Sequence, residues 1–293
     1  LDAVTSLPIF MQNVSPDAKT RDGARAAEEA VTNWYIELSQ RKDLYQAIKA
    51  YADSKPSLQG EQKRSLEFTM RDYRRSGIDL PQDQQDRLKR LEMDLSKLGI
   101  EFETNIAEDM TRVPLNLSEL KGVPADTLSR LTKIGDTYLV GLDGPTYGAI
   151  MDYCSVENTR KKMQWMYRRR APKNIETLNK LLKLRDEHAH LLGYANTVDY
   201  EVETRMAKNS KVIKKFYDDL APVVRKKADQ DLVEIQNAKR VATKNPKAIL
   251  QPWDYAFYKN LLREKKYAVD SQKVSEYFSM ERVVDGLFSL TQK

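Results

Sequence analysis

Apolar residues recur every three or four positions along most of the chain, and this spacing is typical of amphipathic helices. The clearest series follows Pro81 and consists of Leu88, Leu91, Leu95, Leu98 and Phe102. We expect this helix to be the longest in the protein. Because fewer than three or four full heptads are sustained, antiparallel pairing with another helix of the same chain is favoured over a coiled coil with a partner.

The segment from Leu181 to Lys208 predicts two helices joined by a tight turn. The first helix is apolar on more than one face, which indicates burial, and its apolar side includes Leu181, Leu184, His188 and Leu191. Gly193 stands where a left-handed C-cap favours glycine. The second helix is expected to start with Asn196 or Thr197 as N-cap and to carry on one side Val198, Val202 and Met206.

Caps and breakers predict the remaining helices. They favour helices from Ser15-Pro16 to a break near Gln40, from Asp43 to Ala52, from Gln59 to Ser76, from Ser155 to Pro172, from Asn174 to Leu192, from Asn209 or Ser210 to Asn245 with a kink at Pro222, and from Pro252 onward. Asp270 and Ser279 are expected to cap two last short helices.

Between residues 112 and 147 the pattern changes. VPLNL alternates, Ser118 is positioned to cap a short helix, and TYLVGLDGPTY is rich in β-branched and aromatic residues. The GLDG string lacks the Lys-Ser/Thr pair of a phosphate-binding loop. We therefore expect an all-α fold of long antiparallel helices with one small β element, divided into helical hairpins at 1–111, a β-containing insertion at 112–153 and a helical region at 154–293.

Composition is that of an ordinary globular chain. Hydrophobic residues make up 41% and charged residues 31% of 293 residues, with a net charge of +6. No apolar run approaches the ~20 residues that span a bilayer, so no membrane partner is expected and a cytoplasmic location is the default. The single cysteine, Cys154, cannot form an internal disulfide, and we expect it to be a small buried apolar residue.

Six cations crowd the helix after Ser155, and they are the strongest argument for a nucleic-acid surface: Arg160, Lys161, Lys162, Arg168, Arg169 and Arg170. At 100° per residue they spread around the helix and form no single stripe. We expect Trp165 to belong to the core and not to stack on bases. A solvated, partly salt-bridged helix is therefore favoured over nucleic-acid binding.

Six stretches, in order, resemble the zinc-dependent oligopeptidases of the thimet oligopeptidase and saccharolysin type, the M3 metallopeptidase family. They are RKDLYQAIKAY from Arg41, RDYRRSGIDLP from Arg71, FETNIAED from Phe102, LRDEHAHLLGYANTVDYEVETRMAKN from Leu184, PWDYAFY from Pro252 and EYFSMERVVDGLF from Glu276. The resemblance implies a helical enzyme in which two walls flank a deep channel that admits short peptides, with zinc as cofactor.

The family's zinc is held by a His-Glu-x-x-His helix, in which two imidazoles four residues apart share one face. This sequence has no such string. Its two histidines, His188 and His190, point about 200° apart on a helix and cannot chelate one ion. We therefore assign no catalytic and no metal residue to this chain, and leave its substrate-binding residues open.

The apolar helical pattern at Val283, Val284, Leu287, Phe288 and Leu290 runs almost to Lys293 without a stop signal. We interpret the chain as the N-terminal portion of such an enzyme, truncated before its catalytic half, forming a channel wall and inactive alone. Thr197-Val198 departs from the family's His-Ala pair. Asp199-Tyr200 and Trp253-Asp254 are interpreted as cap and core anchor, not substrate contacts. The alternative is a non-catalytic helical module that binds peptides or nucleic acid.

Overall fold

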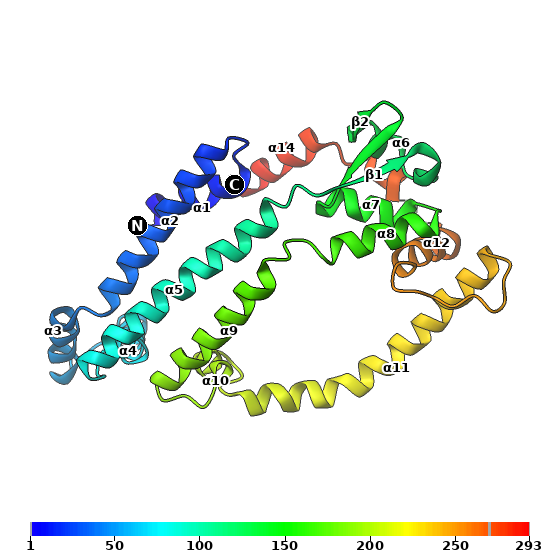
Figure 1. Ribbon diagram of the computed structural model, residues 1–293. Helices are drawn as coiled ribbons and strands as arrows, with labels where there is room; N and C mark the ends of the chain where they lie inside the picture. Colours follow the sequence, from blue (N-terminus) through cyan, green and yellow to red (C-terminus); the bar gives the residue numbers. More distant parts are fainter. Residues whose placement is uncertain (1, 269–270, 293) are drawn as a thin grey trace. The chain divides into compact units, whose positions relative to one another are not determined.

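The computed structural model describes residues 2–268 and 271–292, and they form two compact units. The first unit comprises residues 1–109 and 171–218, and the second comprises residues 110–170 and 219–293. Figure 1 shows helices throughout the chain and one small sheet. The predicted fold class, all-α with a single β element, is confirmed.

The first unit is entirely helical in its described part. Its helices are α1 (Asp2–Val14), α2 (Ala18–Ser39), α3 (Lys42–Asp53), α4 (Gly60–Arg75), α5 (Gln82–Ala107), α9 (Asn174–Leu191), α10 (Thr197–Val202) and the beginning of α11 (Ser210–Ala242). The predicted break near Gln40 is confirmed, because Gln40 is the C-cap of α2. The predicted start of this helix at Ser15-Pro16 is wrong. The N-cap is Asp17, whose side chain accepts the Thr20 N–H.

Helices α5 and α9 run antiparallel (Figure 1), and residues early in α5 meet residues late in α9. Arg87 forms two hydrogen bonds of 2.6 and 2.7 Å with Glu187, and at the other end Asn105 donates to Asn174 across 2.9 Å. Leu88 and Leu91 of the predicted seam are fully buried. The intrachain pairing predicted from the heptad spacing is confirmed, but α11, with 33 residues, is longer than α5, with 26.

The turn after α9 has the geometry that its sequence predicts. Gly193 adopts φ +82°, its N–H donates to the His190 carbonyl, and the Tyr194 N–H reaches back to the Ala189 carbonyl. These two bonds form a Schellman motif. Asn196 then caps α10 by accepting the Asp199 N–H across 2.9 Å. The second helix is shorter than expected and ends at Val202, so Met206 lies beyond it and is 99% exposed.

The second unit contains the sheet, in which β3 (Thr137–Gly141) lies between β1 (Arg112–Asn116) and β2 (Thr132–Ile134), all antiparallel. The unit also contains η1 (Leu117–Leu120), α6 (Ala125–Arg130), α7 (Gly144–Tyr153), α8 (Glu157–Tyr167), residues 219–242 of α11, α12 (Tyr255–Tyr267), α13 (Ser271–Ser275) and α14 (Met280–Thr291). Alternate residues of β1, Val113 and Leu115, face a core completed by Val140, Ile150 and Met163.

In the second unit, two predicted caps and one predicted helix start are corrected, and one predicted cap is confirmed. Asn116, not Ser118, caps η1, in a capping box with Glu119. Ser155 does not cap α8, because its N–H and hydroxyl both bind the Lys121 carbonyl. Asp254, beyond the expected Pro252, precedes α12. Ser279 caps α14 as expected, whereas Asp270 lies outside the described residues.

Candidate functional site

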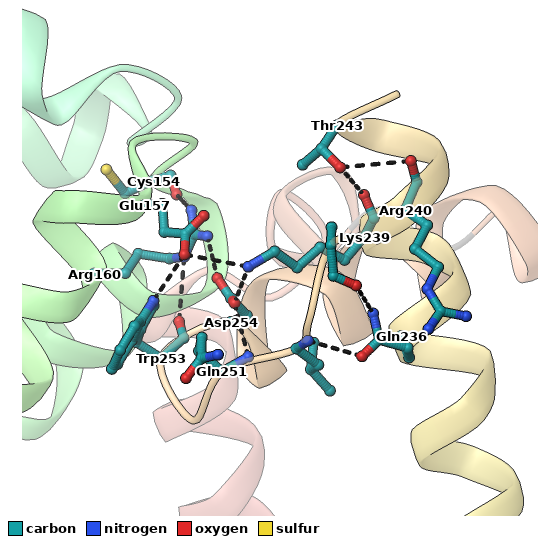
Figure 2. Close-up of polar contacts among 12 residues, drawn as sticks. Cys154, Glu157, Arg160, Gln236, Lys239, Arg240, Thr243, Gln251, Trp253 and Asp254 are labelled. Carbon is teal, nitrogen blue, oxygen red and sulfur yellow. Dashed lines mark hydrogen bonds and ion pairs between the residues drawn. The ribbon is translucent and has the colours of Figure 1, made fainter. Parts of the chain in front are cut away.

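Three charged side chains from distant parts of the second unit are buried together (Figure 2). Arg160 comes from α8, Lys239 from the last turns of α11, and Asp254 from the residue before α12. Their exposed fractions are 1%, 4% and 0%. Burying a charge is costly unless it is paired and hydrogen-bonded, so this cluster has to be complete to be stable.

The Asp254 carboxylate is the centre of the cluster. It accepts hydrogen bonds from the Arg160 guanidinium (2.7 Å), the Lys239 ammonium (2.5 Å) and the backbone N–H of Gln251 (2.9 Å). Its acceptor positions are therefore used within the fold. We infer that this carboxylate positions α8, α11 and α12 and is not set up to transfer a proton to a substrate.

The two cations are satisfied as well. Arg160 donates to the carbonyls of Cys154 (2.7 Å) and Trp253 (3.2 Å), and its Cζ lies 4.4 Å from the Phe257 ring centroid. Lys239 also donates to Glu157 across 3.2 Å. Burial lowers the pKa of Lys239, but hydrogen bonds to Asp254 and Glu157 outweigh it, so the pKa lies above its ordinary value and the amine is charged at neutral pH.

Gln236 fastens the loop that leads to Asp254. Its amide nitrogen donates to the Ala248 carbonyl across 2.5 Å, and its amide oxygen accepts the Leu250 N–H across 2.8 Å. Gln236 and Lys239 are three residues apart on α11 and therefore share one face of the helix. Together they hold both the middle and the end of the loop between α11 and α12, as Figure 2 shows.

One prediction for this region is wrong, because Trp165, expected in the core, is 58% exposed. The partly salt-bridged helix expected here is present, with Lys161, Lys162, Arg168 and Arg169 exposed. Its ion-paired member, Arg160, is buried against a partner 94 residues away in sequence. The interpretation of Trp253-Asp254 as cap and core anchor identified an important position, but the Asp254 side chain makes no cap hydrogen bond to α12 and binds the two cations instead.

A second polar cluster, in the first unit, joins α4 to α10 and the residues on either side of α10. Arg75 donates to the Tyr200 carbonyl (2.8 Å) and to Glu203, and its Cζ lies 4.3 Å from the Tyr200 ring centroid. The Tyr194 hydroxyl donates to Glu203 across 2.6 Å. This hydrogen bond, followed by that from Arg75, holds the pKa of the Glu203 carboxyl below its usual value. Asp199, expected to be a cap, accepts the N–H of Ser210, the first residue of α11.

The two histidines do not fit a zinc ion. His188 is buried, with Nε2 3.5 Å from a Glu92 oxygen and its ring edge-on to Tyr200. His190 is exposed, and its Nδ1 lies 2.8 Å from the Asp186 carbonyl oxygen. Among residues 2–268 and 271–292, no three His, Cys, Asp or Glu side chains form a group that could hold a metal.

Known relatives identify the class of protein. The chain is 31% identical to a thimet-like oligopeptidase of Dictyostelium discoideum, over 97% of this chain and 45% of the relative. It is 27% identical to saccharolysin of Saccharomyces cerevisiae, over 96% of this chain and 42% of the relative. The chain is therefore similar to these two proteins along almost its whole length.

The family follows from the second half of the chain, where residues 150–293 match peptidase family M3. Together with the relatives, this match supports a fragment of peptidase family M3. It spans less than half the length of these two relatives. In the described part of the chain, no helix is long and apolar enough to cross a bilayer.

Proposed function

We propose that this chain belongs to a zinc-dependent endopeptidase that hydrolyses short peptides inside a deep channel, in the cytoplasm. The observation that carries the proposal is the similarity to oligopeptidases along almost the whole chain, 97% and 96% of it in two relatives from distant organisms. Peptide hydrolysis is the activity that the names of these relatives share.

We further propose that these 293 residues form part of the channel wall and do not catalyse hydrolysis on their own. The sequence contains no His-Glu-x-x-His string, and its two histidines are engaged with different partners. The buried cluster around Asp254 and the half-buried cluster around Glu203 support a structural role, because their hydrogen-bonding groups hold helices together. The catalytic groups would then be supplied by other residues of the protein.

The decisive experiment compares two polypeptides in an assay with a quenched fluorescent peptide and added zinc. We expect no turnover by the 293-residue chain, and cleavage by a longer polypeptide that includes a His-Glu-x-x-His helix. Thermal unfolding of the 293-residue chain provides a readout that does not depend on activity. A ligand at free concentration c that binds only the folded state stabilises it by RT ln(1 + c/Kd), so zinc should leave the melting temperature unchanged if the chain does not bind it.

Turnover by the 293-residue chain that disappears in a His188→Gln/His190→Gln variant would contradict this proposal, as would stabilisation by zinc that depends on the same two residues. The alternative is a non-catalytic helical module. It would gain support if the longer polypeptide also failed to cleave while calorimetry detected binding of short peptides, or of a nucleic acid with steep salt dependence.

A further inference from the structure

Helix α8 and the turn after it carry four exposed side chains that are three or four residues apart: Lys161, Trp165, Arg168 and Arg169. Trp165 follows Lys161 by four residues and precedes Arg168 by three and Arg169 by four. These intervals place all four side chains on one face of the helix. The Arg169 N–H donates to the Met166 carbonyl, so the helical sense continues through this turn. We call these four residues the α8 face.

The charge on this face is not balanced locally. Residues 158–170 contain six cations and no acidic residue. Only Arg160 is neutralised by a buried carboxylate, and Glu157 just before this stretch is occupied by Lys239 and the Trp253 indole. Within the described part of the chain, Lys161, Arg168 and Arg169 form no ion pair with an acidic side chain.

Trp165 and Arg169 form a preorganised pair. The Arg169 Cζ lies 3.1 Å from the Trp165 ring centroid, so the guanidinium is stacked on one face of the indole. Stacking covers the flat face of the guanidinium and leaves the N–H groups at its edge available for a carboxylate. A binding anchor also needs an accessible aromatic surface, and Trp165 provides one because it is 58% exposed.

The size of the face favours a peptide over a nucleic acid. The eight residue steps from Lys161 to Arg169 extend about 12 Å along the helix, and the face offers one aromatic ring and three cations over that length. Nucleic-acid binding generally needs a longer cationic track and repeated stacking platforms. We propose that the α8 face binds an acidic peptide segment, with a carboxylate on Arg169 and a neighbouring apolar side chain against Trp165. This binding requires no catalytic step and does not depend on the proposed peptidase activity.

The test measures fluorescence anisotropy of a labelled, end-blocked peptide Glu-Asp-Phe-Asp-Glu added to the whole 293-residue chain at low salt. We expect saturable binding that weakens at least about tenfold, or about 1.4 kcal/mol, in the Arg168→Gln/Arg169→Gln variant. Trp165→Ala should weaken it similarly, and Trp165→Tyr should retain most of it. Lys247→Gln and Tyr277→Ala are matched controls, because both residues are exposed in the same unit, and neither should change the affinity.

Circular dichroism melting curves establish that each variant is folded. A second labelled peptide, Gln-Asn-Phe-Asn-Gln, replaces each carboxylate with an amide. Equal affinity for this peptide and for Glu-Asp-Phe-Asp-Glu would overturn the proposal, because the carboxylates would then contribute nothing. Undiminished binding by the folded double arginine variant would also overturn it. Tighter binding of a labelled uridine oligonucleotide, lost in the same variants, would identify the α8 face as a nucleic-acid surface and contradict the assignment to peptides.

Discussion

The Arg160 guanidinium and the Asp254 carboxylate lie 2.7 Å apart, with side-chain exposures of 1% and 0%, although 94 residues separate them in sequence. This ion pair links α8 to the start of α12, and Lys239 adds α11 to the same carboxylate. The three charges stabilise the fold only when all of them are present, because removing one partner leaves a buried charge without compensation.

Asp254→Asn should destabilise the protein strongly. The substitution keeps the size of the side chain but leaves Arg160 and Lys239 facing a neutral amide, so we expect a loss of about 3–5 kcal/mol in the free energy of unfolding. Urea denaturation followed by circular dichroism measures it. The control is Asp126→Asn, which removes an exposed pair with Arg130 and should have little effect. Equal stability of the two variants would show that the buried pair is not important.

Gln236→Ala should loosen the loop before α12. The variant removes both hydrogen bonds to the loop, at Ala248 and Leu250, and each should contribute about 1 kcal/mol. Hydrogen exchange at the Leu250 amide should become faster. Gln230→Ala, an exposed position on the same helix, is the control and should leave that amide unchanged. Unaltered exchange in Gln236→Ala would mean that the loop is held by other contacts.

Glu203 should make stability depend on acid pH. Hydrogen bonds from Tyr194 and Arg75 hold its pKa below the ordinary value, so the folded state takes up a proton less readily than the unfolded state. The stabilisation is therefore present above the unfolded pKa of about 4.3 and is lost as pH falls through the lower folded value. The free energy of unfolding should fall less steeply with acidification in Glu203→Gln than in the exposed control Glu201→Gln. Parallel pH profiles would contradict this.

Cys154 should be inert in the folded protein. Its side chain is fully buried, its Sγ lies 3.2 Å from the Glu119 carbonyl, and burial raises the pKa of the thiol. Because the thiolate is the reactive form, iodoacetamide should label Cys154 only after denaturation, as measured by intact mass. Rapid labelling under native conditions, with the circular dichroism signal unchanged, would show that the region around α7 and α8 opens readily.

Local signals in the sequence were sufficient for much of the first unit. The spacing of leucines after Pro81 predicted that α5 pairs antiparallel with another helix of the same chain, and Gly193 and Asn196 predicted the turn between α9 and α10. The leucine spacing and the two caps are each read from residues within a few turns of one another, although the helix that pairs with α5 is distant in sequence. Steric freedom at a positive φ and the capping of free N–H groups are properties of the local backbone, so sequence alone determines them.

The environment of α8 was decided by tertiary structure. An apolar spacing shows which face of a helix can be buried, but it does not show which cation will meet a distant carboxylate. Arg160 is buried because Asp254 and the Trp253 carbonyl reach it from the start of α12, and Trp165 is left exposed with Arg169 stacked on it. Burial of a charge depends on compensation in three dimensions, and only the folded chain brings the compensating groups together.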